Sequence, residues 1–308
     1  MARQESPRDE SPNVQGDLGR RKSLSISTPP LSVAQEVASL LSSADRIQQD
    51  AARLILQAEV YKLVTARFFS EARIGEGMQV LDIGSGTGDV SILVSELVGS
   101  TGSVMGIDRN AVTVEIATEH ARKAGKANVM FVHDDVESMN LTGRFDAIVG
   151  RFVLRELKDP VRSLRKLSHL LAPEGIIAFQ EKVLALPVTT FPHLSLVDQI
   201  CSWMDAVRHR AGVELAMGAK LPSFYLAAGL PSPHLRFDAP VGYGPDWVGY
   251  EYLVETLRGM LPLIYLYSIA SEADIGIDDL TTRMRTEAGP ATMILTPCIG
   301  AWAVRRSP

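Results

Sequence analysis

The sequence predicts an α/β protein built on a seven-stranded, mostly parallel sheet with helices on both faces. Short runs rich in β-branched residues alternate with stretches whose apolar residues recur every three or four positions. Nearly continuous apolar strands are typical of a parallel sheet that is buried on both faces. A glycine-rich turn directly follows the first run, at the edge where such sheets bind ligands.

The composition restricts the class of protein. The chain has 308 residues, 46% of them hydrophobic, and a formal net charge of −5. No basic cluster is present to match nucleic-acid phosphates, so no nucleic-acid partner is expected. Cys201 and Cys298 are the only cysteines and lack metal-ligand spacing, so neither a metal site nor a disulfide is expected.

The first 76 residues contain two kinds of segment. Residues 1–30 are rich in Ser, Pro and charged residues, without apolar periodicity, and are predicted to form a disordered tail. Residues 31–76 are predicted to form helices over a cofactor site. No signal peptide is recognisable, and residues 261–270, the most apolar stretch, are too short for a membrane span of about 20 residues. We therefore expect no membrane span and a cytoplasmic location.

The remaining chain, residues 77–308, is predicted to be one domain, with two domains as the weaker alternative. After the fifth strand the alternation changes, and helices predominate over residues 186–290, which are expected to form a cap over the ligand edge. The predicted strands are residues 78–83, 103–107, 129–133, 145–149, 175–182, 234–241 and 291–304. The predicted helices are residues 89–97, 111–124, 159–171, 191–229, 246–270 and 278–287.

The turn after the first strand carries the strongest functional signal. An apolar strand leads into Gly84, Gly86 and Gly88, and a helix begins near Asp89. Glycines allow positive φ and a close backbone approach, while a helix N-terminus offers unpaired N–H groups. Asp82 suits a cationic group such as the ammonium of a methionine moiety and would repel a pyrophosphate. A dinucleotide fingerprint also requires a small residue at position 89, so S-adenosylmethionine (SAM) is favoured over NAD.

Acidic residues end the next two strands. Asp108 ends the second strand, where a carboxylate can accept hydrogen bonds from both ribose hydroxyls. Asp135 follows the third strand and is expected to accept from the adenine amino group, with Val136 donating its backbone N–H. Gly150 and Arg151 follow the fourth strand on the same edge.

In order and spacing, these segments resemble the successive motifs of class I SAM-dependent methyltransferases, which have a Rossmann-like fold. These motifs are similar to those of the ubiquinone/menaquinone-methyltransferase-like branch, which includes small-molecule enzymes of secondary metabolism. The resemblance covers roughly residues 53–181. The matching segments are Asp82-Ile-Gly-Ser-Gly-Thr-Gly88, Gly106-Ile-Asp108, Asp134-Asp135-Val136, Phe145-Asp-Ala-Ile-Val149 and Leu171-Ala-Pro-Glu-Gly-Ile-Ile177.

The resemblance implies a role for each matching position. The glycine loop would lie beside the methionine part of SAM, with Asp82 engaging its amino group directly or through water. Asp108 would hold the ribose, Arg109 would border the adenine, and Arg151 would close the site beneath the sulfonium. The adenine motif departs from the more frequent Gly-Asp-Ala, which leaves the assignment of Asp134 and Asp135 open. The implied cofactor-binding residues are Asp82, Gly84, Ser85, Gly86, Gly88, Asp108, Arg109, Asp135, Val136 and Arg151.

No motif marks a catalytic base. Methyl transfer is an in-line displacement, and only a poor nucleophile such as a hydroxyl or a carbon acid also needs a base. His193 and Glu181 are candidates because they lie just after and at the end of the fifth strand, and His133 neighbours the adenine loop. An ordinary polar or capping role is the alternative for each.

The cap residues favour a small, largely apolar acceptor, methylated on an O, N or C atom. Methionine and aromatic side chains suit adaptable apolar pockets, although they also serve simply to pack a cap. The alternative functions are SAM-dependent cyclisation or rearrangement, NAD-dependent oxidoreduction and SAM binding without catalysis. A homodimer is a further expectation. The cap residues concerned are Trp203, Met204, Met217, Phe224, Tyr225, Tyr250, Tyr252, Met260, Tyr265 and Tyr267.

Overall fold

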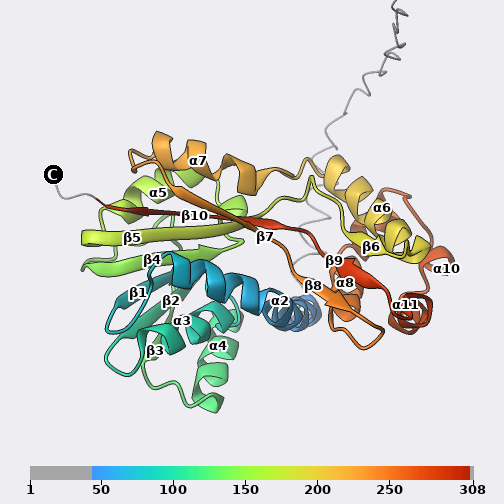
Figure 1. Cartoon of the computed structure of the whole chain (residues 1–308), viewed down its shortest axis with the longest axis horizontal. Coiled ribbons are helices and arrows are strands. Elements are labelled where there is room, and N and C mark those ends of the chain that lie inside the picture. The colour runs from blue at the N-terminus through green and yellow to red at the C-terminus, as the bar shows by residue number, and fades with distance from the viewer. Residues whose placement is uncertain (1–43, 306–308) are drawn as a thin grey trace, which may run out of the picture.

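The computed structural model describes residues 44–305, and the predictions for residues 1–43 lie outside this range. The predicted fold class is confirmed by a seven-stranded sheet of order β3-β2-β1-β4-β5-β10-β7 (Figure 1). β1 to β5 are mutually parallel, whereas β10 is antiparallel to both of its neighbours. The strands are β1 (Gln79–Ile83), β2 (Ser103–Asp108), β3 (Val129–His133), β4 (Phe145–Arg151), β5 (Leu171–Lys182), β7 (His234–Asp238) and β10 (Cys298–Val304).

Helices cover both faces of this sheet. Side chains alternate along each strand, so Leu81 and Val80 of β1 belong to different core clusters on opposite faces. One face packs against α5 and α7, and the other against α2 and α3, while α4 contacts β2 and β3. The helices are α2 (Ala44–Glu71), α3 (Asp89–Val98), α4 (Ala111–Lys123), α5 (Pro160–Ser168) and α7 (Met217–Ala227).

The strand order reverses between β1 and β4. From β1 the chain proceeds outward to β2 and β3, and it then returns to place β4 and β5 on the other side of β1. In open α/β sheets, ligands bind in the crevice that such a switch point leaves at the carboxyl ends of the strands. The topology therefore places the expected ligand site at the ends of β1 and β4.

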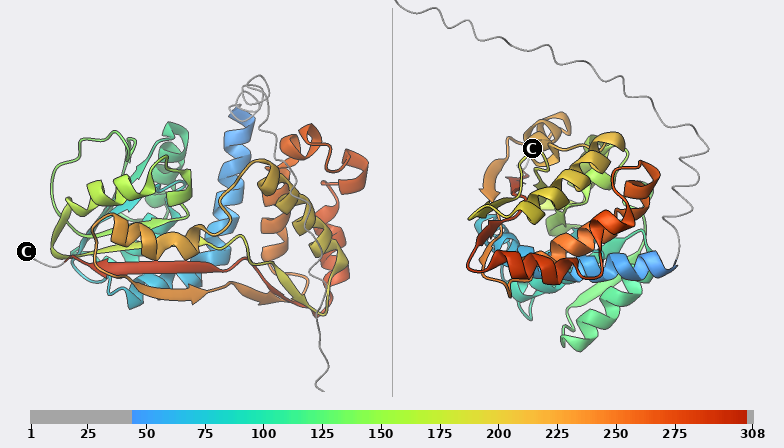
Figure 2. Two further views of the ribbon diagram at one scale, coloured as in Figure 1. Left: turned by 90° about the horizontal axis from the view of Figure 1, so that it is seen from above. Right: turned by 90° about the vertical axis from the view of Figure 1, so that its right-hand side faces the viewer.

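Two predicted strands are each divided by a proline, which corrects the prediction of single strands. The predicted strand 234–241 breaks before Pro240, and the predicted strand 291–304 breaks at Pro297. Proline has no N–H to donate to a strand ladder. Each segment connects the large sheet with a small antiparallel sheet of order β6-β9-β8 (Figure 2). Its strands are β6 (Thr189–Phe191), β8 (Val241–Tyr243) and β9 (Thr292–Ile294).

The C-terminal half also supplies a group of helices, which we call the cap, at the carboxyl ends of the strands (Figure 1). The cap shares an apolar core with α2, which includes Tyr61, Val64, Ile200 and Leu253. Pro262 lies in the first turn of its helix, a tolerated position, and therefore does not kink a longer helix. The cap helices are α6 (Ser195–Arg210), α8 (Gly249–Arg258), α9 (Leu261–Leu266), α10 (Glu272–Ile275) and α11 (Leu280–Ala288).

One helix that was expected in the cap lies elsewhere. α7 packs on the sheet beside α5, so Met217, Phe224 and Tyr225 belong to the sheet core rather than to the cap. The Tyr225 hydroxyl donates to the Ala301 carbonyl at 2.7 Å and accepts from the Phe179 N–H at 3.2 Å. Helical periodicity over residues 191–229 predicts helices but does not show against which layer each of them packs.

Candidate functional site

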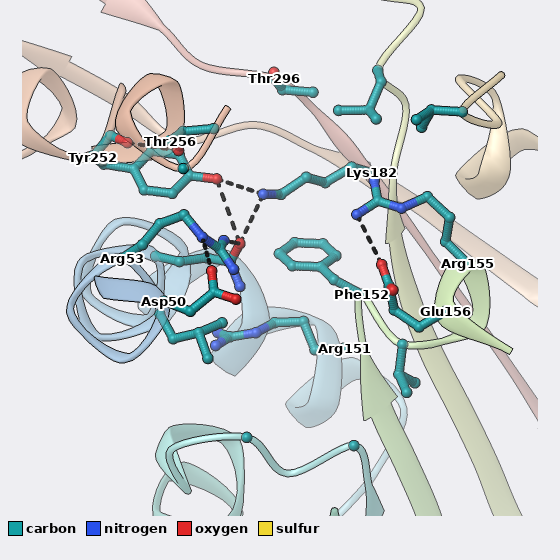
Figure 3. Close-up of a pocket in the computed structure, with 18 of the residues that line it drawn as sticks. Asp50, Arg53, Arg151, Phe152, Arg155, Glu156, Lys182, Tyr252, Thr256 and Thr296 are labelled. Carbon is teal, nitrogen blue, oxygen red and sulfur yellow. Dashed lines mark hydrogen bonds and ion pairs between the residues drawn. The ribbon is translucent and has the colours of Figure 1, made fainter. Parts of the chain in front are cut away.

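A cavity of about 590 Å³ lies between the carboxyl ends of the strands, α2 and the cap (Figure 3). Its volume falls within the range of about 300–1,000 Å³ that ligand sites occupy. At one end it is lined by the glycine loop and by residues that follow β2 and β3. At the other end it is lined by residues of β5, α6 and α8.

The glycine loop takes a backbone conformation that other residues adopt with strain. Gly84, Gly86 and Gly88 have φ values of 68°, 51° and 87°. The Gly84 N–H donates to the Ile107 carbonyl at 2.8 Å and thereby ties the loop to β2. A Cβ on Gly84 would lie 2.4 Å from Val153 Cγ2. Gly84 and Gly86 both line the cavity, so their backbone forms part of its wall.

Gly88 has a packing role rather than a place in the cavity wall. A Cβ at this position would lie 2.8 Å from Phe131 Cζ and 3.0 Å from the Ala117 Cβ. Gly88 is also the N-terminal cap residue of α3. Its lack of a side chain therefore allows α3 to begin close to β3 and α4.

Asp82 lies beneath the loop and does not line the cavity directly. Its side chain is 1% exposed, and Oδ2 accepts from Ser91 Oγ at 2.6 Å. Burial raises the pKa of Asp82 to about 7, against the lowering effects of the Ser91 hydrogen bond and Arg151. Neither Asp82 Oδ1 nor the buried Ser85 Oγ has a hydrogen-bond partner among the described residues. Two such atoms under the loop fit the amino group of a methionine moiety, reached directly or through water.

Asp108 lines the cavity in a fixed orientation. Its Oδ2 accepts from the Gly86 N–H at 2.9 Å, and its Oδ1 accepts from the Asn110 N–H at 2.9 Å and from Thr113 Oγ1 at 3.2 Å. A carboxylate has about four acceptor positions, so these contacts leave capacity for ligand hydroxyls. The geometry fits the binding of a ribose diol.

The loop after β3 contributes three consecutive residues to the cavity, which are Asp134, Asp135 and Val136. Asp134 Oδ1 accepts from the Asp135 N–H at 2.8 Å, and Asp135 Oδ1 accepts from the Glu137 N–H at 2.9 Å. Both aspartates thus border the cavity, so either of them is placed to contact an adenine.

The end of β4 forms the floor of the cavity between its two ends. A Cβ on Gly150 would lie 2.5 Å from the Phe179 ring, so only glycine fits there. Arg151 lines the cavity, and its Nη1 donates to Thr65 Oγ1 at 3.3 Å; burial lowers its pKa, while Asp89 and Asp82 raise it. Phe152 also lines the cavity and has a φ of 60°, a conformation that costs a bulky residue about 1–3 kcal/mol.

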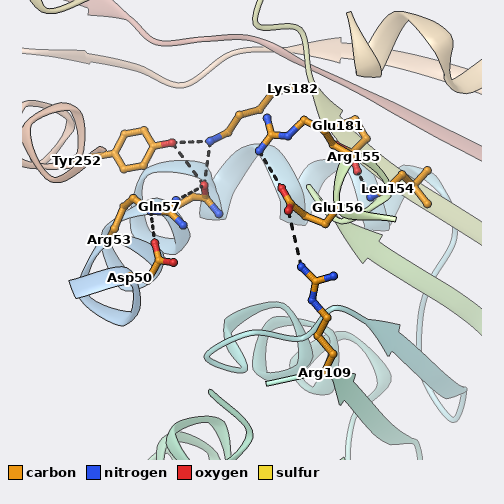
Figure 4. Close-up of polar contacts among 10 residues, drawn as sticks. All are labelled: Asp50, Arg53, Gln57, Arg109, Leu154, Arg155, Glu156, Glu181, Lys182 and Tyr252. Carbon is orange, nitrogen blue, oxygen red and sulfur yellow. Dashed lines mark hydrogen bonds and ion pairs between the residues drawn. The ribbon is translucent and has the colours of Figure 1, made fainter. Parts of the chain in front are cut away.

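The end of the cavity beneath the cap contains a polar cluster. Lys182 Nζ donates to Tyr252 Oη at 2.5 Å and to Gln57 Oε1 at 2.9 Å (Figure 4). The same nitrogen lies 4.6 Å, 5.0 Å and 5.2 Å from the ring centroids of Phe152, Tyr61 and Tyr252, respectively. We call Lys182, Tyr252 and Gln57 the Lys182 cluster.

The protonation of this cluster is perturbed. The pKa of Lys182 is lowered to about 8; burial is the main cause, Arg53 and Arg155 add to it, and Tyr252 opposes it. Burial alone would raise the pKa of Tyr252, but Lys182 and Arg53 outweigh it and hold the pKa below its ordinary value. Perturbed groups in a cavity are candidates for proton transfer.

Charged side chains also meet on the sheet side of the cavity (Figure 4). Arg109 pairs with Glu156 at 3.9 Å, and Arg155 pairs with the same carboxylate at 3.3 Å. On α2, Arg53 pairs with Asp50 at 3.0 Å. Arg109 and Glu156 are both more than half exposed, so their pairing contributes little to stability.

The three positional candidates for a base all lie outside the cavity lining. His193 has a side chain that is 70% exposed and bonds to Asp198 at 2.6 Å. His133 Nε2 lies 3.1 Å from the Arg109 carbonyl oxygen. These two histidines are therefore not positioned to act on a molecule in this cavity.

Glu181 is buried on the other side of β5. It is 2% exposed, and its Oε1 accepts from the Leu154 N–H at 2.7 Å, which holds the short helix η1 (Leu154–Glu156). Burial raises its pKa to about 7. Successive side chains of a strand point to opposite faces, so the next residue, Lys182, faces the cavity instead. Tyr252 was predicted only as a cap aromatic, and Lys182 and Gln57 were not predicted as site residues. A lysine that ends an apolar strand at the ligand edge was the available signal.

Comparison with known proteins identifies the family. Residues 74–229, half of the chain, match the family described as "Methyltransferase domain", and the chain belongs to this family. Together with the fold, this match confirms the predicted class I SAM-dependent methyltransferase, and SAM is its cofactor.

The chain is also similar to two relatives and to one solved structure. It is 36% identical over 138 residues to an arsenite methyltransferase of Aquipseudomonas alcaligenes, covering 41% of this chain and 40% of that protein. It is 33% identical over 128 residues to a demethylmenaquinone methyltransferase of Staphylococcus aureus, covering 41% and 52%. The chain thus spans about half or less of the length of these relatives. The protein BH2331 of Bacillus halodurans shares the fold, with a TM-score of 0.52 and 14% identity over 79% of this chain and 99% of that one.

Proposed function

We propose that this protein transfers the methyl group of SAM to an O, N or C atom of a small, largely apolar organic molecule. One observation carries the proposal: a single cavity has the glycine loop and Asp108 at one end and cap residues at the other. In-line displacement requires donor and acceptor to be held together at attack distance, with water excluded. A cavity shared by both ends meets this requirement.

In this proposal, SAM lies across the ends of β3, β2 and β1. Asp108 accepts from the ribose hydroxyls, and Asp135 and Val136 contact the adenine. Gly84 and Gly86 pass beside the methionine moiety, whose amino group interacts with Asp82 Oδ1 directly or through water. Support comes from the fixed Asp108 carboxylate and from the unpartnered atoms beneath the loop.

Further roles complete the cofactor site in this proposal. Arg151 lies beneath the sulfonium at the end of β4, and Arg109 borders the adenine. Both side chains line the cavity. Gly88 acts through the packing of α3 rather than by contact with SAM.

The acceptor end favours an organic molecule over arsenite, which is the substrate named for one relative. Arsenic(III) is a soft centre that binds thiolates. Of the two cysteines, Cys201 lines the cavity and Cys298 does not. Burial raises the pKa of the Cys201 thiol to about 12, so this group stays protonated. The surrounding lining includes Met204, Leu253, Met260 and Leu295, which suit an apolar body.

Calorimetric titration with SAM and, separately, NADH tests the cofactor assignment on the full chain. Incubation with methyl-labelled SAM and a panel of organic acceptors then tests transfer. We expect SAM binding, a labelled product and equimolar release of S-adenosylhomocysteine. Product formation without that release would select cyclisation or rearrangement, and binding of NADH instead of SAM would overturn the proposal.

The cellular setting completes the proposal. We place the reaction in secondary metabolism in the cytoplasm, and a homodimer stays a prediction. Among the helices of the described part of the chain, none combines the length and apolar character needed to cross a membrane.

A further inference from the structure

The Lys182 cluster lies at the end of the cavity opposite Asp108. In the sheet, β5 is three strands away from β2, with β1 and β4 between them. At about 4.8 Å per strand, Lys182 lies roughly 14 Å along the sheet edge from the Asp108 strand. If SAM occupies the ends of β3, β2 and β1, the space beside Lys182 belongs to the acceptor.

The positive charge of Lys182 has no carboxylate partner. In the described part of the chain, Lys182 Nζ donates to Tyr252 Oη and Gln57 Oε1 and forms no ion pair. An ammonium has three donors, so one remains for a ligand. A partly buried ammonium without a counter-ion favours the binding of an anionic oxygen.

The other groups around Lys182 come from several neighbouring elements, and the carboxylates that line this end of the cavity are each paired with an arginine. The neutral and cationic groups are Tyr252 and Thr256 of α8, Arg53 and Tyr61 of α2, Arg155 of η1, Phe152 after β4 and Cys298 of β10. Asp50 pairs with Arg53, Glu156 with Arg155, and Asp205 of α6 with Arg208. Glu181 points to the other face of β5. The ring faces of Tyr61, Phe152 and Tyr252 provide a flat apolar surround for a planar molecule.

We propose that the acceptor is an acidic hydroxyl compound, a phenol or an enol, whose oxygen binds beside Lys182 and gives its proton to the Lys182 amine. This inference rests on the proposed methyltransferase function and names its substrate class and its base. Gln57 and Tyr252 are positioning residues, because they hold Nζ through hydrogen bonds.

The reaction balances without a further reactant. Neutral Lys182 takes the hydroxyl proton, and the oxyanion uses an electron pair to form a bond with the methyl carbon of SAM. The C–S bond breaks with its electron pair left on sulfur, so the sulfonium becomes the neutral thioether of S-adenosylhomocysteine. The Lys182 ammonium then releases its proton to solvent.

Burial supports this role, because it brings the pKa of Lys182 to about 8. A useful fraction of Lys182 is then neutral near physiological pH, whereas an ordinary lysine with a pKa of about 10.4 would be almost fully protonated. Turnover should therefore rise with pH as Lys182 loses its proton, with its midpoint near pH 8 and a plateau at higher pH.

A spectroscopic experiment tests the site independently of the natural acceptor. The full-length protein, saturated with S-adenosylhomocysteine, is titrated with 4-nitrophenol below the pKa of the free phenol, and the visible band of the phenolate is followed. We expect wild type to bind the phenol as phenolate, Lys182→Met to lose the band and Lys182→Arg to keep it. Lys123→Met is the matched control, because this exposed lysine of α4 pairs only with Glu119 and should leave the band unchanged.

A turnover experiment distinguishes the base from a structural role. We expect 2-naphthol to be methylated, and its isostere 2-naphthylamine not. Lys182→Met should lower kcat by roughly 10²–10⁴-fold, as loss of a general base does, with SAM affinity retained. Lys182→Arg should also lose kcat and the rise towards pH 8, although it keeps the charge. Circular dichroism melting checks that both variants fold.

The outcomes separate the two proposals. If wild type binds SAM but shows no phenolate band, or transfers methyl groups to the amine rather than the hydroxyl, the assignment of Lys182 is wrong and the methyltransferase function stands. If the protein does not bind SAM, the proposed function itself fails.

Discussion

The two ends of the cavity are built in different ways. The cofactor end consists of consecutive residues after β1, β2 and β3, held by short-range contacts such as the Gly86 N–H to Asp108 and the Glu137 N–H to Asp135. The acceptor end joins Gln57, Lys182 and Tyr252 from a helix, a strand and a cap helix. The first end depends on local backbone conformation, and the second depends on how separate elements pack. Substitutions at the two ends should therefore have separable effects.

The largest loss of unfolding free energy is expected at Gly84, where a neighbouring side chain occupies the space that a Cβ would need. Gly84→Ala combines a left-handed φ, which costs about 1–2 kcal/mol, with a contact 2.4 Å from Val153, for which overpacking costs about 1–3 kcal/mol. We expect the unfolding free energy to fall by roughly 3–4 kcal/mol in urea denaturation. Gly86→Ala shares the φ but meets only Leu54 at 3.7 Å, so a loss of about 1 kcal/mol is expected. Equal losses would show that local strain alone governs this loop.

The next effect concerns Glu181, which is buried on the face of β5 away from the cavity, and it depends on pH. The folded-state pKa of Glu181 is raised from 4.5 to about 7, so native Glu181 holds its proton where the unfolded chain has lost it. Its contribution to stability therefore declines as pH rises from about 4.5 to about 7, by up to about 3 kcal/mol. Glu181→Gln, which can still accept from the Leu154 N–H, should match wild type at pH 4 and be more stable at pH 8. Denaturation at both pH values measures this, and a large loss of turnover in Glu181→Gln would instead restore Glu181 as a base.

A smaller effect is expected when the charge of Asp108, the proposed ribose ligand, is removed. Asp108→Asn keeps the shape but loses charge-assisted hydrogen bonds worth about 2 kcal/mol, so SAM affinity should fall about 30-fold in calorimetry. Asp146→Asn is the control, because that carboxylate accepts from the Gln79 N–H at the amino ends of the strands. Unchanged affinity in Asp108→Asn would contradict the proposed ribose contact.

The smallest effect on SAM affinity is expected for a substitution at the acceptor end, and it tests whether the two ends of the cavity act independently. Tyr252→Phe removes a partner of Lys182 but none of the groups at the cofactor end. Distant sites are usually additive to within about 0.5 kcal/mol, so SAM affinity should stay within roughly twofold of wild type. The pKa of Lys182 should fall, because Tyr252 raises it, and the pH profile of turnover should shift to lower pH. A tenfold change in SAM affinity would show that the two ends are coupled.

Much of the fold could be predicted from local pattern. The predicted strand 129–133 coincides with β3, and predicted strand 78–83 differs from β1 by one residue at its start. Buried parallel strands are apolar along their whole length, so their signal is contiguous in the sequence. The predictions were wrong where they depended on which layer an element joins. α7 packs in the sheet core and not in the cap, and Pro240 and Pro297 each divide a predicted strand between two sheets.

The site likewise has one part that local sequence predicted and one part that it did not. The structure brings Gly84, Gly86, Asp108 and Asp135 around one cavity, as their places after successive strands suggested. No spacing predicted Lys182 and Gln57, because 125 residues separate them. The candidate His193 failed for the same reason, since nearness in sequence to the end of β5 did not bring it into the cavity.

By itself, therefore, the sequence determined the sheet, the glycine loop and the acidic residues at the strand ends. Each of these depends on backbone conformation within a few consecutive residues. Only the tertiary structure decided which side of β5 faces the cavity, which helices form the cap and which side chains meet Lys182. Those outcomes come from burying apolar surfaces of distant segments against one another, and the free energy of that packing belongs to no single stretch of chain.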